Sequence, residues 1–275
     1  MRESLQRATR KGIIRIGISG WRYEPWRGVF YPDALPQRLE LEYASRMFRS
    51  IEINGSFYSL QSPNYYASWR DQTPANFVFS VKGPQFATNR RVLAEAGQSI
   101  ERFFASGVLE LKSKLGPVLW QMAPTKKFDP EDFAPFLALL PPRLDGRPIR
   151  HVVEVRHESF LAPAFIELLR KFSVAAVVVE SDKHPLIADV TADFVYARLQ
   201  RTSEKEKTGY PPRALELWAK RARSWAAGAA PDDLATITAP LPQSGKRDVF
   251  IYMISGAKVR APAAAIALIE RLDEK

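Results

Sequence analysis

The chain of 275 residues contains no cysteine. This absence excludes disulfide bridges, thiolate nucleophiles, and zinc or iron–sulfur sites held by cysteine. Nothing therefore ties the protein to an oxidising compartment, and we expect a cytoplasmic location. Histidine is scarce as well, with three positions, so a multi-zinc hydrolase built on imidazole ligands is not expected. Carboxylates and water could still hold magnesium or manganese.

Long apolar runs are also missing. Residues 1–12, MRESLQRATRKG, are polar and basic and lack the apolar core of a signal peptide, so we expect a disordered basic tail. No later stretch approaches the roughly 20 apolar residues of a membrane span, which predicts a soluble protein. Without an internal repeat or a linker rich in glycine and serine, residues 13–275 are expected to form one domain.

Positive charge is in excess. Forty Lys and Arg residues against 30 Asp and Glu give a net charge of +10, and the pI is about 9.8. Contact with nucleic acid or with an anionic small molecule is physically reasonable for such a chain, and contact with a membrane is not expected. From charge alone, a basic solvated surface is the simpler interpretation.

Short apolar, β-branched runs alternate with segments of helical spacing. The runs are IIRIGIS, SIEIN, FVFSVK, PVLWQM, HVVEVR, AAVVVES, FVYARL and VFIYMIS. Strands that alternate with helices predict parallel strands joined by crossovers, and eight units favour an α/β fold with a single (β/α)₈ TIM barrel. The sixth unit is expected to be irregular, because KHPLIADVTAD is short and contains proline. An open doubly wound sheet is the competitor, but no glycine-rich phosphate motif follows the first run.

The helical segments have their own signals. Ser62 before Pro63 and Asp129 before Pro130 predict helix N-caps. Apolar positions three and four residues apart predict helices over residues 98–115 and 213–227. Residues 230–248, APDDLATITAPLPQSGKRD, indicate a long excursion before the last strand.

Polar side chains occur where the predicted strands end. In a barrel the carboxyl ends of all strands meet at one mouth, which usually holds the functional site. The residues at these ends are Ser19, Glu52, Asn54, Lys82, Gln121, Glu154, Arg156, Glu180, Asp182, Arg198 and Ser255. Their number indicates a polar mouth.

Two glutamates share one pattern, with Glu52 in IEIN and Glu154 in VEVR. They could act as acid and base, hold a metal, or form ion pairs with nearby cations. Lys82, Arg156 and Arg198 could grip a phosphate or carboxylate, or could simply neutralise the carboxylates of the same face. Gln121 could hydrogen-bond a ligand or cap the barrel interior.

Several other residues have two interpretations. His157 could be a general base, although RHESF also suits a structural helix entry. Trp21 begins an aromatic loop with interleaved arginines, which could stack on bases or sugars, or form a satellite core. Phe57 and Tyr58 allow the same two interpretations. The loop QRTSEKEKTGYPP could be a lid carrying Tyr210, or a solvated connection.

The sequence resembles the YecE-like family of TIM barrels, a widespread domain of unknown function. The matching landmarks span residues 14–270 and include IGISGWRYEPWRGVFYP, YASRMFRSIEINGSFYSL, WRDQTPANFVFSVKGP, EVRHESF and GYPPRALELWAKR. The resemblance implies a TIM barrel, with similarity to metal-dependent sugar isomerases and DNA-repair endonucleases as an analogy only. Its motif residues retained here are Glu52, Asn54, Phe57, Tyr58, Lys82, Gln121, Glu154, Arg156, His157 and Arg198. The chain departs from the family pattern at Asn89, Gln200, Arg201 and Ser255.

These observations predict an enzyme, or an enzyme-derived protein, that binds an anionic ligand such as a phosphorylated sugar or nucleic-acid fragment at the barrel mouth. The catalytic candidates are Glu52, Glu154 and His157. The ligand-binding candidates are Trp21, Asn54, Tyr58, Lys82, Gln121, Arg156, Asp182 and Arg198. The alternatives are a non-catalytic nucleic-acid-binding protein and a glycoside hydrolase that uses two carboxylates.

Overall fold

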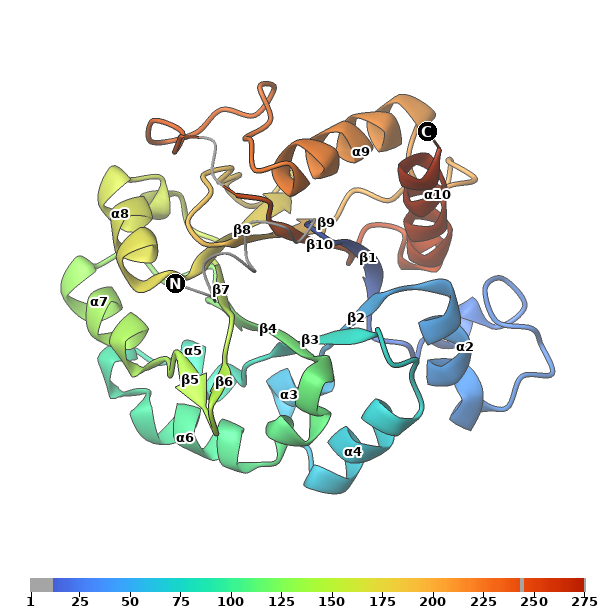
Figure 1. Cartoon of the computed structure of the whole chain (residues 1–275), viewed down its shortest axis with the longest axis horizontal. Helices are drawn as coiled ribbons and strands as arrows, with labels where there is room; N and C mark the ends of the chain where they lie inside the picture. Colours follow the sequence, from blue (N-terminus) through green and yellow to red (C-terminus); the bar gives the residue numbers. More distant parts are fainter. Residues whose placement is uncertain (1–11, 243–244, 275) are drawn as a thin grey trace.

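The computed structural model describes residues 12–242 and 245–274. Eight parallel strands close into a barrel in the order β1-β10-β9-β8-β7-β4-β3-β2 (Figure 1). The strands are β1 (Ile14–Ser19), β2 (Ser50–Ile53), β3 (Val78–Lys82), β4 (Leu115–Gln121), β7 (His151–Glu154), β8 (Ala175–Glu180), β9 (Phe194–Leu199) and β10 (Asp248–Met253). The predicted α/β barrel is confirmed. Residues 1–11 of the predicted tail over residues 1–12 lie outside the described residues, and the tail stays a prediction.

Helices surround the barrel (Figure 1). The longer ones are α2 (Glu40–Met47), α4 (Pro63–Asp71), α6 (Gly97–Ala105), α7 (Pro130–Leu139), α8 (Pro163–Phe172), α9 (Pro212–Ala226) and α10 (Ala261–Asp273). The shorter elements are α3 (Gly55–Tyr58), α5 (Gln85–Thr88), the hairpin strands β5 (Arg143–Leu144) and β6 (Arg147–Pro148), and the 3₁₀ turns η1 (Glu24–Trp26), η2 (Gln37–Leu39), η3 (Leu93–Glu95), η4 (Val108–Lys114), η5 (Glu158–Phe160) and η6 (Lys258–Arg260). The last helix, α10, packs against α9 and β1, which completes the ring of helices.

Local sequence explains where the helices begin and end. At the start of α7, the Asp129 side chain accepts a hydrogen bond from the Glu131 amide, as an N-cap does. Ser62 precedes α4 without such a side-chain bond in the described structure. The single helix expected over residues 98–115 is wrong, because α6 ends at Ala105 and η4 starts a separate turn. Gly107 divides them with φ +106°, a left-handed conformation that favours glycine.

The sixth unit is irregular, as predicted. Residues 181–193 join β8 to β9 in turns and irregular conformation. The Asp189 carboxylate accepts hydrogen bonds from the Ile237 amide at 2.8 Å and from the Thr238 amide at 2.9 Å. This carboxylate therefore ties the irregular unit to the long excursion that precedes β10.

Alternation along the strands decides which side chains enter the barrel. On β9, Phe194 and Tyr196 belong to a buried cluster inside the barrel, whereas Val195 and Ala197 pack in the layer between strands and helices. Since successive strand residues face opposite ways, Arg198 shares the inner face with Tyr196. The same count places Glu154 above Val152 and Gln121 above Leu119. The barrel is thus apolar in its middle and charged at its carboxyl-terminal mouth.

Candidate functional site

A buried cluster of charged side chains fills the mouth of the barrel. Its five members come from the ends of five strands: Glu52, Lys82, Gln121, Glu154 and Arg198. All of them are buried, and both glutamates have no exposed surface. The structure therefore brings together six of the predicted site residues, when Arg156 just beyond β7 is included.

Arg198 is the centre of this cluster. Its Nη2 atom donates to Glu52 Oε1 at 2.9 Å, and its Nη1 atom donates to Glu154 Oε2 and to Gln121 Oε1. Burial opposes the charged form of Arg198, but the two carboxylates outweigh burial and raise its pKa above the ordinary value. The guanidinium is therefore a permanent cation that joins three strands across the mouth.

Glu52 is held by further donors. The Ser19 hydroxyl donates to its Oε1 atom at 2.9 Å, and the Tyr196 hydroxyl donates to its Oε2 atom at 2.6 Å. Asn54 reaches the cluster indirectly, because its amide donates to the Ser19 hydroxyl. Both carboxylate oxygens of Glu52 thus accept hydrogen bonds from protein groups.

The tyrosine beneath Glu52 belongs to a polar layer that sequence reasoning missed. Tyr196 OH lies 2.7 Å from Ser80 Oγ, and Tyr252 OH lies 2.6 Å from Ser50 Oγ. Burial and the nearby carboxylate raise the pKa of Tyr196 well above its usual range, so it stays a protonated donor. The signal in the sequence was the position of Tyr196 two residues before Arg198, on the same face of the strand.

Glu154 is a fixed anion. Burial favours its neutral form, but Arg198 and Arg156 outweigh burial and lower its pKa to about 2. Arg156 Nε donates to Glu154 Oε1 at 2.7 Å, and the Arg156 side chain remains 21% exposed. Glu154 stays ionised near neutral pH and accepts from both arginines, which leaves it poorly suited to act as a general acid.

Lys82 has a different environment from the arginines. Its Nζ atom donates to Gln121 Oε1 at 3.0 Å and lies 3.9 Å from the centre of the Phe57 ring. Burial lowers the pKa of Lys82 to about 8, helped by the positive charge of Arg198 and opposed by the two glutamates. The ammonium is therefore easier to deprotonate than that of a surface lysine.

Three predicted ligand-binding residues have other contacts. Tyr58 is 71% exposed, and its ring meets the Phe57 ring edge to face. Trp21 packs edge to face on Trp69 with ring centres 5.2 Å apart. Asp182 forms an exposed ion pair with Arg201 at 3.0 Å. Their assignment as ligand-binding residues stays a prediction.

The three histidines differ in surroundings. His157 Nδ1 accepts a hydrogen bond from the Ser159 amide at 3.1 Å and caps η5, which supports the structural interpretation of RHESF. His151 is a buried neutral ring: burial lowers its pKa to about 4, Trp120 Nε1 donates to its Nδ1 atom, and its Nε2 atom faces the Pro141 carbonyl. His184, in the irregular sixth unit, was missed. Burial and the charge of Arg156 lower its pKa, so this ring lies near the cluster.

The aromatic loop after β1 forms a satellite core. Trp26 and Tyr31 are buried, and the Phe30 ring contacts both Tyr31 and Phe48. Trp26 Nε1 donates to the Lys258 carbonyl at 2.9 Å, which ties this core to the turn before α10. These buried rings have protein neighbours on their faces, which leaves them unsuited to stacking on bases.

The loop after β9 is anchored rather than free. Tyr210 is buried, and its hydroxyl donates to Glu180 Oε2 at 2.5 Å. Trp218 Nε1 donates to the second oxygen of Glu180 at 3.1 Å. The strand-end carboxylate Glu180 therefore holds the loop and α9 in place, so Tyr210 does not act as the mobile tip of a lid.

The positions that depart from the family pattern lie in the connections around the mouth. Asn89 is the C-cap residue after α5. The backbone amide of Gln200 donates to the backbone carbonyl of Glu180 at 3.0 Å. Arg201 is exposed in its pair with Asp182. The Ser255 carbonyl accepts from the Thr202 hydroxyl at 2.8 Å, which joins the loops after β9 and β10.

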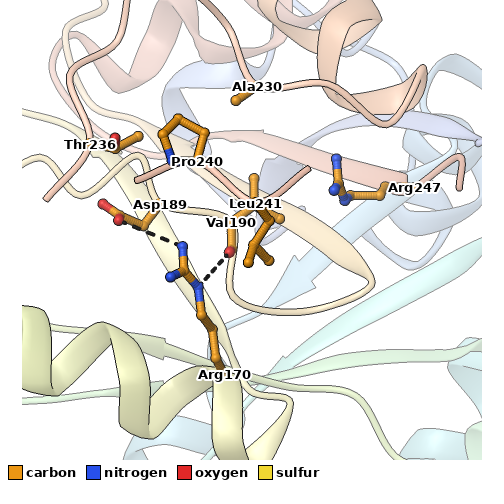
Figure 2. A pocket seen from close by; sticks show the side chains of 8 residues that line it. All are labelled: Arg170, Asp189, Val190, Ala230, Thr236, Pro240, Leu241 and Arg247. Carbon is orange, nitrogen blue, oxygen red and sulfur yellow. Dashed lines mark hydrogen bonds and ion pairs between the residues drawn. The ribbon is translucent and has the colours of Figure 1, made fainter. Parts of the chain in front are cut away.

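A polar pocket lies at the end of the barrel opposite the mouth, before the strands β9 and β10 begin (Figure 2). Arg170 points toward Asp189 and the Val190 carbonyl, and Arg247 lines the opposite side (Figure 2). Asp189 is already saturated by the excursion loop. The contacts of Asp189 around this pocket therefore hold the irregular segments together.

Within residues 12–242 and 245–274, no group of three or more His, Cys, Asp or Glu side chains is placed to hold a metal ion. No helix in this part of the chain is both long enough and apolar enough to cross a membrane.

A family model described as "Protein of unknown function DUF72" matches residues 15–275. The chain belongs to the DUF72 family. The UPF0759 protein YunF of Bacillus subtilis is 27% identical over 59% of this chain and 57% of its own length, and the UPF0759 protein YecE of Escherichia coli is 28% identical over 54% and 51%. The matches thus span about half the length of these curated relatives. The YecE-like resemblance is confirmed.

Solved structures share the fold of this DUF72 chain. A DUF72 family protein from Thermotoga maritima superposes with a TM-score of 0.75 at 22% identity, over 95% of this chain and 100% of the other. A DUF72 family protein from Enterococcus faecalis gives 0.67 at 16% identity, over 96% of each. SacUVDE gives 0.51 at 9% identity, over 94% of this chain and 98% of the other. At such identities the likeness concerns the fold alone.

Proposed function

We propose that this DUF72 protein is an enzyme, or an enzyme-derived protein, that binds an anionic ligand at the carboxyl-terminal mouth of its barrel. The observation that carries the proposal is the cluster of three cations, buried Lys82 and Arg198 and partly exposed Arg156, around two buried carboxylates. The cations outnumber the anions by one, and an uncompensated positive charge in a largely buried cluster favours a negative charge from the ligand. The ligand class is a phosphorylated sugar or a nucleic-acid fragment.

The members of the cluster have different parts in this proposal. Both Nη atoms of Arg198 donate to Glu52, Glu154 and Gln121, so this residue would position the cluster and would not bind the ligand directly. Arg156 uses Nε alone for hydrogen bonding within the described residues, and its two Nη atoms can form a fork toward a phosphate or carboxylate. Lys82 supplies the second cation. The ligand would therefore lie between Arg156 and Lys82.

The glycoside hydrolase alternative is the weaker one. Such an enzyme needs one carboxyl group with a raised pKa to protonate the leaving oxygen. The pKa of Glu154 is lowered to about 2, and Glu52 accepts from Ser19, Tyr196 and Arg198. Neither carboxyl group is placed to donate a proton to a sugar.

Binding measurements test the proposal and its nucleic-acid alternative together. Isothermal calorimetry would compare ribose 5-phosphate with ribose, and fluorescence anisotropy would follow labelled single- and double-stranded oligonucleotides at low and near-physiological salt. Arg156→Met removes the proposed fork, and Arg201→Met, an exposed arginine near the same end, is the matched control.

The outcomes separate the classes of ligand. Selective binding of the phosphorylated sugar that Arg156→Met weakens and Arg201→Met leaves intact supports a pocket for a small anion. Oligonucleotide binding that falls steeply with salt and ignores Arg156→Met indicates a surface interaction with the phosphate backbone instead. Absence of both, with the wild-type protein folded, contradicts an anionic ligand at the mouth.

A further inference from the structure

Lys82 differs from the other cations of the mouth in having no carboxylate partner among the described residues. Arg156 and Arg198 both donate to Glu154. The Lys82 ammonium donates instead to the neutral amide oxygen of Gln121 at 3.0 Å, and one of its sides is covered by the Phe57 ring at 3.9 Å. A lysine that is 5% exposed would ordinarily be paired with a carboxylate.

This environment raises the share of the neutral amine at Lys82, although the ammonium still predominates at neutral pH. Burial is the largest cause, and the guanidinium of Arg198 adds repulsion between like charges, while Arg156 adds a smaller repulsion. The carboxylates of Glu52 and Glu154 oppose these effects without cancelling them. At neutral pH a lysine with a pKa near 8 is unprotonated in roughly a tenth of the molecules, whereas an exposed lysine is unprotonated in less than about a thousandth of them.

We propose that Lys82 is a nucleophilic amine that forms an imine with a carbonyl ligand at the barrel mouth. A desolvated lysine beside another cation is an arrangement that activates the amine for this chemistry. The inference rests on the proposed function, because it takes the mouth as the ligand site. It narrows the ligand to an aldehyde or ketone that also carries an anionic group, which an open-chain phosphorylated sugar provides.

The reaction needs no further reactant. The ammonium of Lys82 first releases one proton to solvent. The Nζ lone pair then attacks the carbonyl carbon, and the electron pair of the C=O π bond moves to oxygen. The nitrogen loses a proton as this oxygen takes one up, which gives a neutral carbinolamine. A proton from solvent joins the hydroxyl group, which leaves as water while the nitrogen lone pair forms the C=N bond, and the product is a protonated imine. Arg156, with its free Nη atoms, would hold the anionic group of the same ligand.

Reductive trapping tests the inference directly. The folded protein is treated at neutral pH with glycolaldehyde and cyanoborohydride, which reduces imines to stable secondary amines, and each modified lysine is located by peptide mass spectrometry. We expect Lys82 to be modified at least about tenfold faster than the exposed Lys205 and Lys207. Lys82→Arg keeps the charge and cannot form the imine, so it should lose the fast site while its circular dichroism spectrum is unchanged.

Slow modification of Lys82 overturns the inference. If Lys82 in the folded protein is modified no faster than Lys205, yet is modified readily in urea, the Phe57 ring shields the amine and its role is electrostatic. Trapping with glycolaldehyde phosphate separates this result from the proposed function. Suppose that glycolaldehyde traps Lys82 fast, and that glycolaldehyde phosphate is no faster in the wild type or in Arg156→Met. The reactive amine is then supported and the anion site is contradicted. Selective binding of the phosphorylated sugar without trapping of Lys82 supports the anion site and contradicts the reactive amine.

Discussion

Arg198 Nη1 and Glu154 Oε2 form an ion pair inside the barrel mouth, with Arg198 2% exposed and Glu154 fully buried. The two residues lie on β9 and β7, with β8 between them. Arg198 reaches across to Glu52 on β2 as well. One guanidinium therefore bridges two buried carboxylates that would otherwise repel each other.

Removal of this guanidinium should destabilise the fold. Arg198→Met leaves buried Glu52 without a cation and Glu154 with Arg156 as its remaining cation, so we expect the free energy of unfolding to fall by about 3–5 kcal/mol. Urea denaturation followed by circular dichroism measures the change. Arg201→Met is the control, since its ion pair with Asp182 is exposed and should contribute less than about 1 kcal/mol. Equal effects of the two variants would contradict the central position of Arg198.

Acid should weaken the same ion pair. Glu154 has its pKa lowered from 4.5 to about 2 in the folded chain, so the unfolded chain binds the proton more readily. Stability from this group is fully present above about pH 5 and is lost as the pH falls from about 4.5 to 2. Urea midpoints measured across this window should fall less steeply in Glu154→Gln. An unchanged slope in the variant would assign the acid sensitivity to other carboxylates.

The carboxylate of Glu180 holds the loop after β9 through the hydroxyl of Tyr210. Tyr210→Phe removes the hydrogen bond to Glu180 Oε2 and leaves Trp218 as the remaining donor, so we expect a loss of about 1–3 kcal/mol in stability. Limited proteolysis should also cut residues 201–209 faster in this variant. Tyr58→Phe, at a 71% exposed ring, is the matched control and should change neither measurement.

Divalent cations should leave the mouth cluster unchanged. The Glu52 oxygens accept from Ser19, Tyr196 and Arg198, so a metal would have to displace these donors before binding. We expect millimolar magnesium or manganese to leave the melting temperature of the protein unaltered. A rise in melting temperature that Glu52→Gln abolishes would show that the carboxylate gives up these donors for a hard cation.

Most of the barrel could be predicted because its signals are local. Each strand is a short β-branched run, and the proline-broken stretch before β9 marked the irregular sixth unit. Position at the carboxyl end of a strand was enough to place Glu52 and Arg198 at the polar mouth. The kink at Gly107 was missed, because helical spacing continues on both sides of a residue whose left-handed φ the pattern does not encode.

The pairing within the site depends on closure of the sheet. Glu52 and Arg198 are 146 residues apart in sequence, and their contact arises from the radius and register of the closed barrel. The contact between Lys82 and Gln121 has the same origin, since β3 and β4 are neighbours in the barrel wall. The aromatic residues Trp21 and Tyr58 could not be placed in this way, because the sequence of a loop does not reveal whether a ring packs inward or outward.

Alkaline pH should reveal the buried amine of Lys82. Its pKa is lowered from 10.5 to about 8 in the folded chain, so between these values the unfolded chain binds more protons than the folded one. The free energy of unfolding should therefore rise from about pH 8 to 10.5 through this group, whereas an exposed lysine contributes no such rise. Lys82→Met should remove the rise, and Lys205→Met, an exposed lysine, should preserve it. If stability in the wild type falls across this range just as it does in Lys82→Met, the ammonium of Lys82 is stabilised by the carboxylates of the mouth, and the amine is not available at neutral pH.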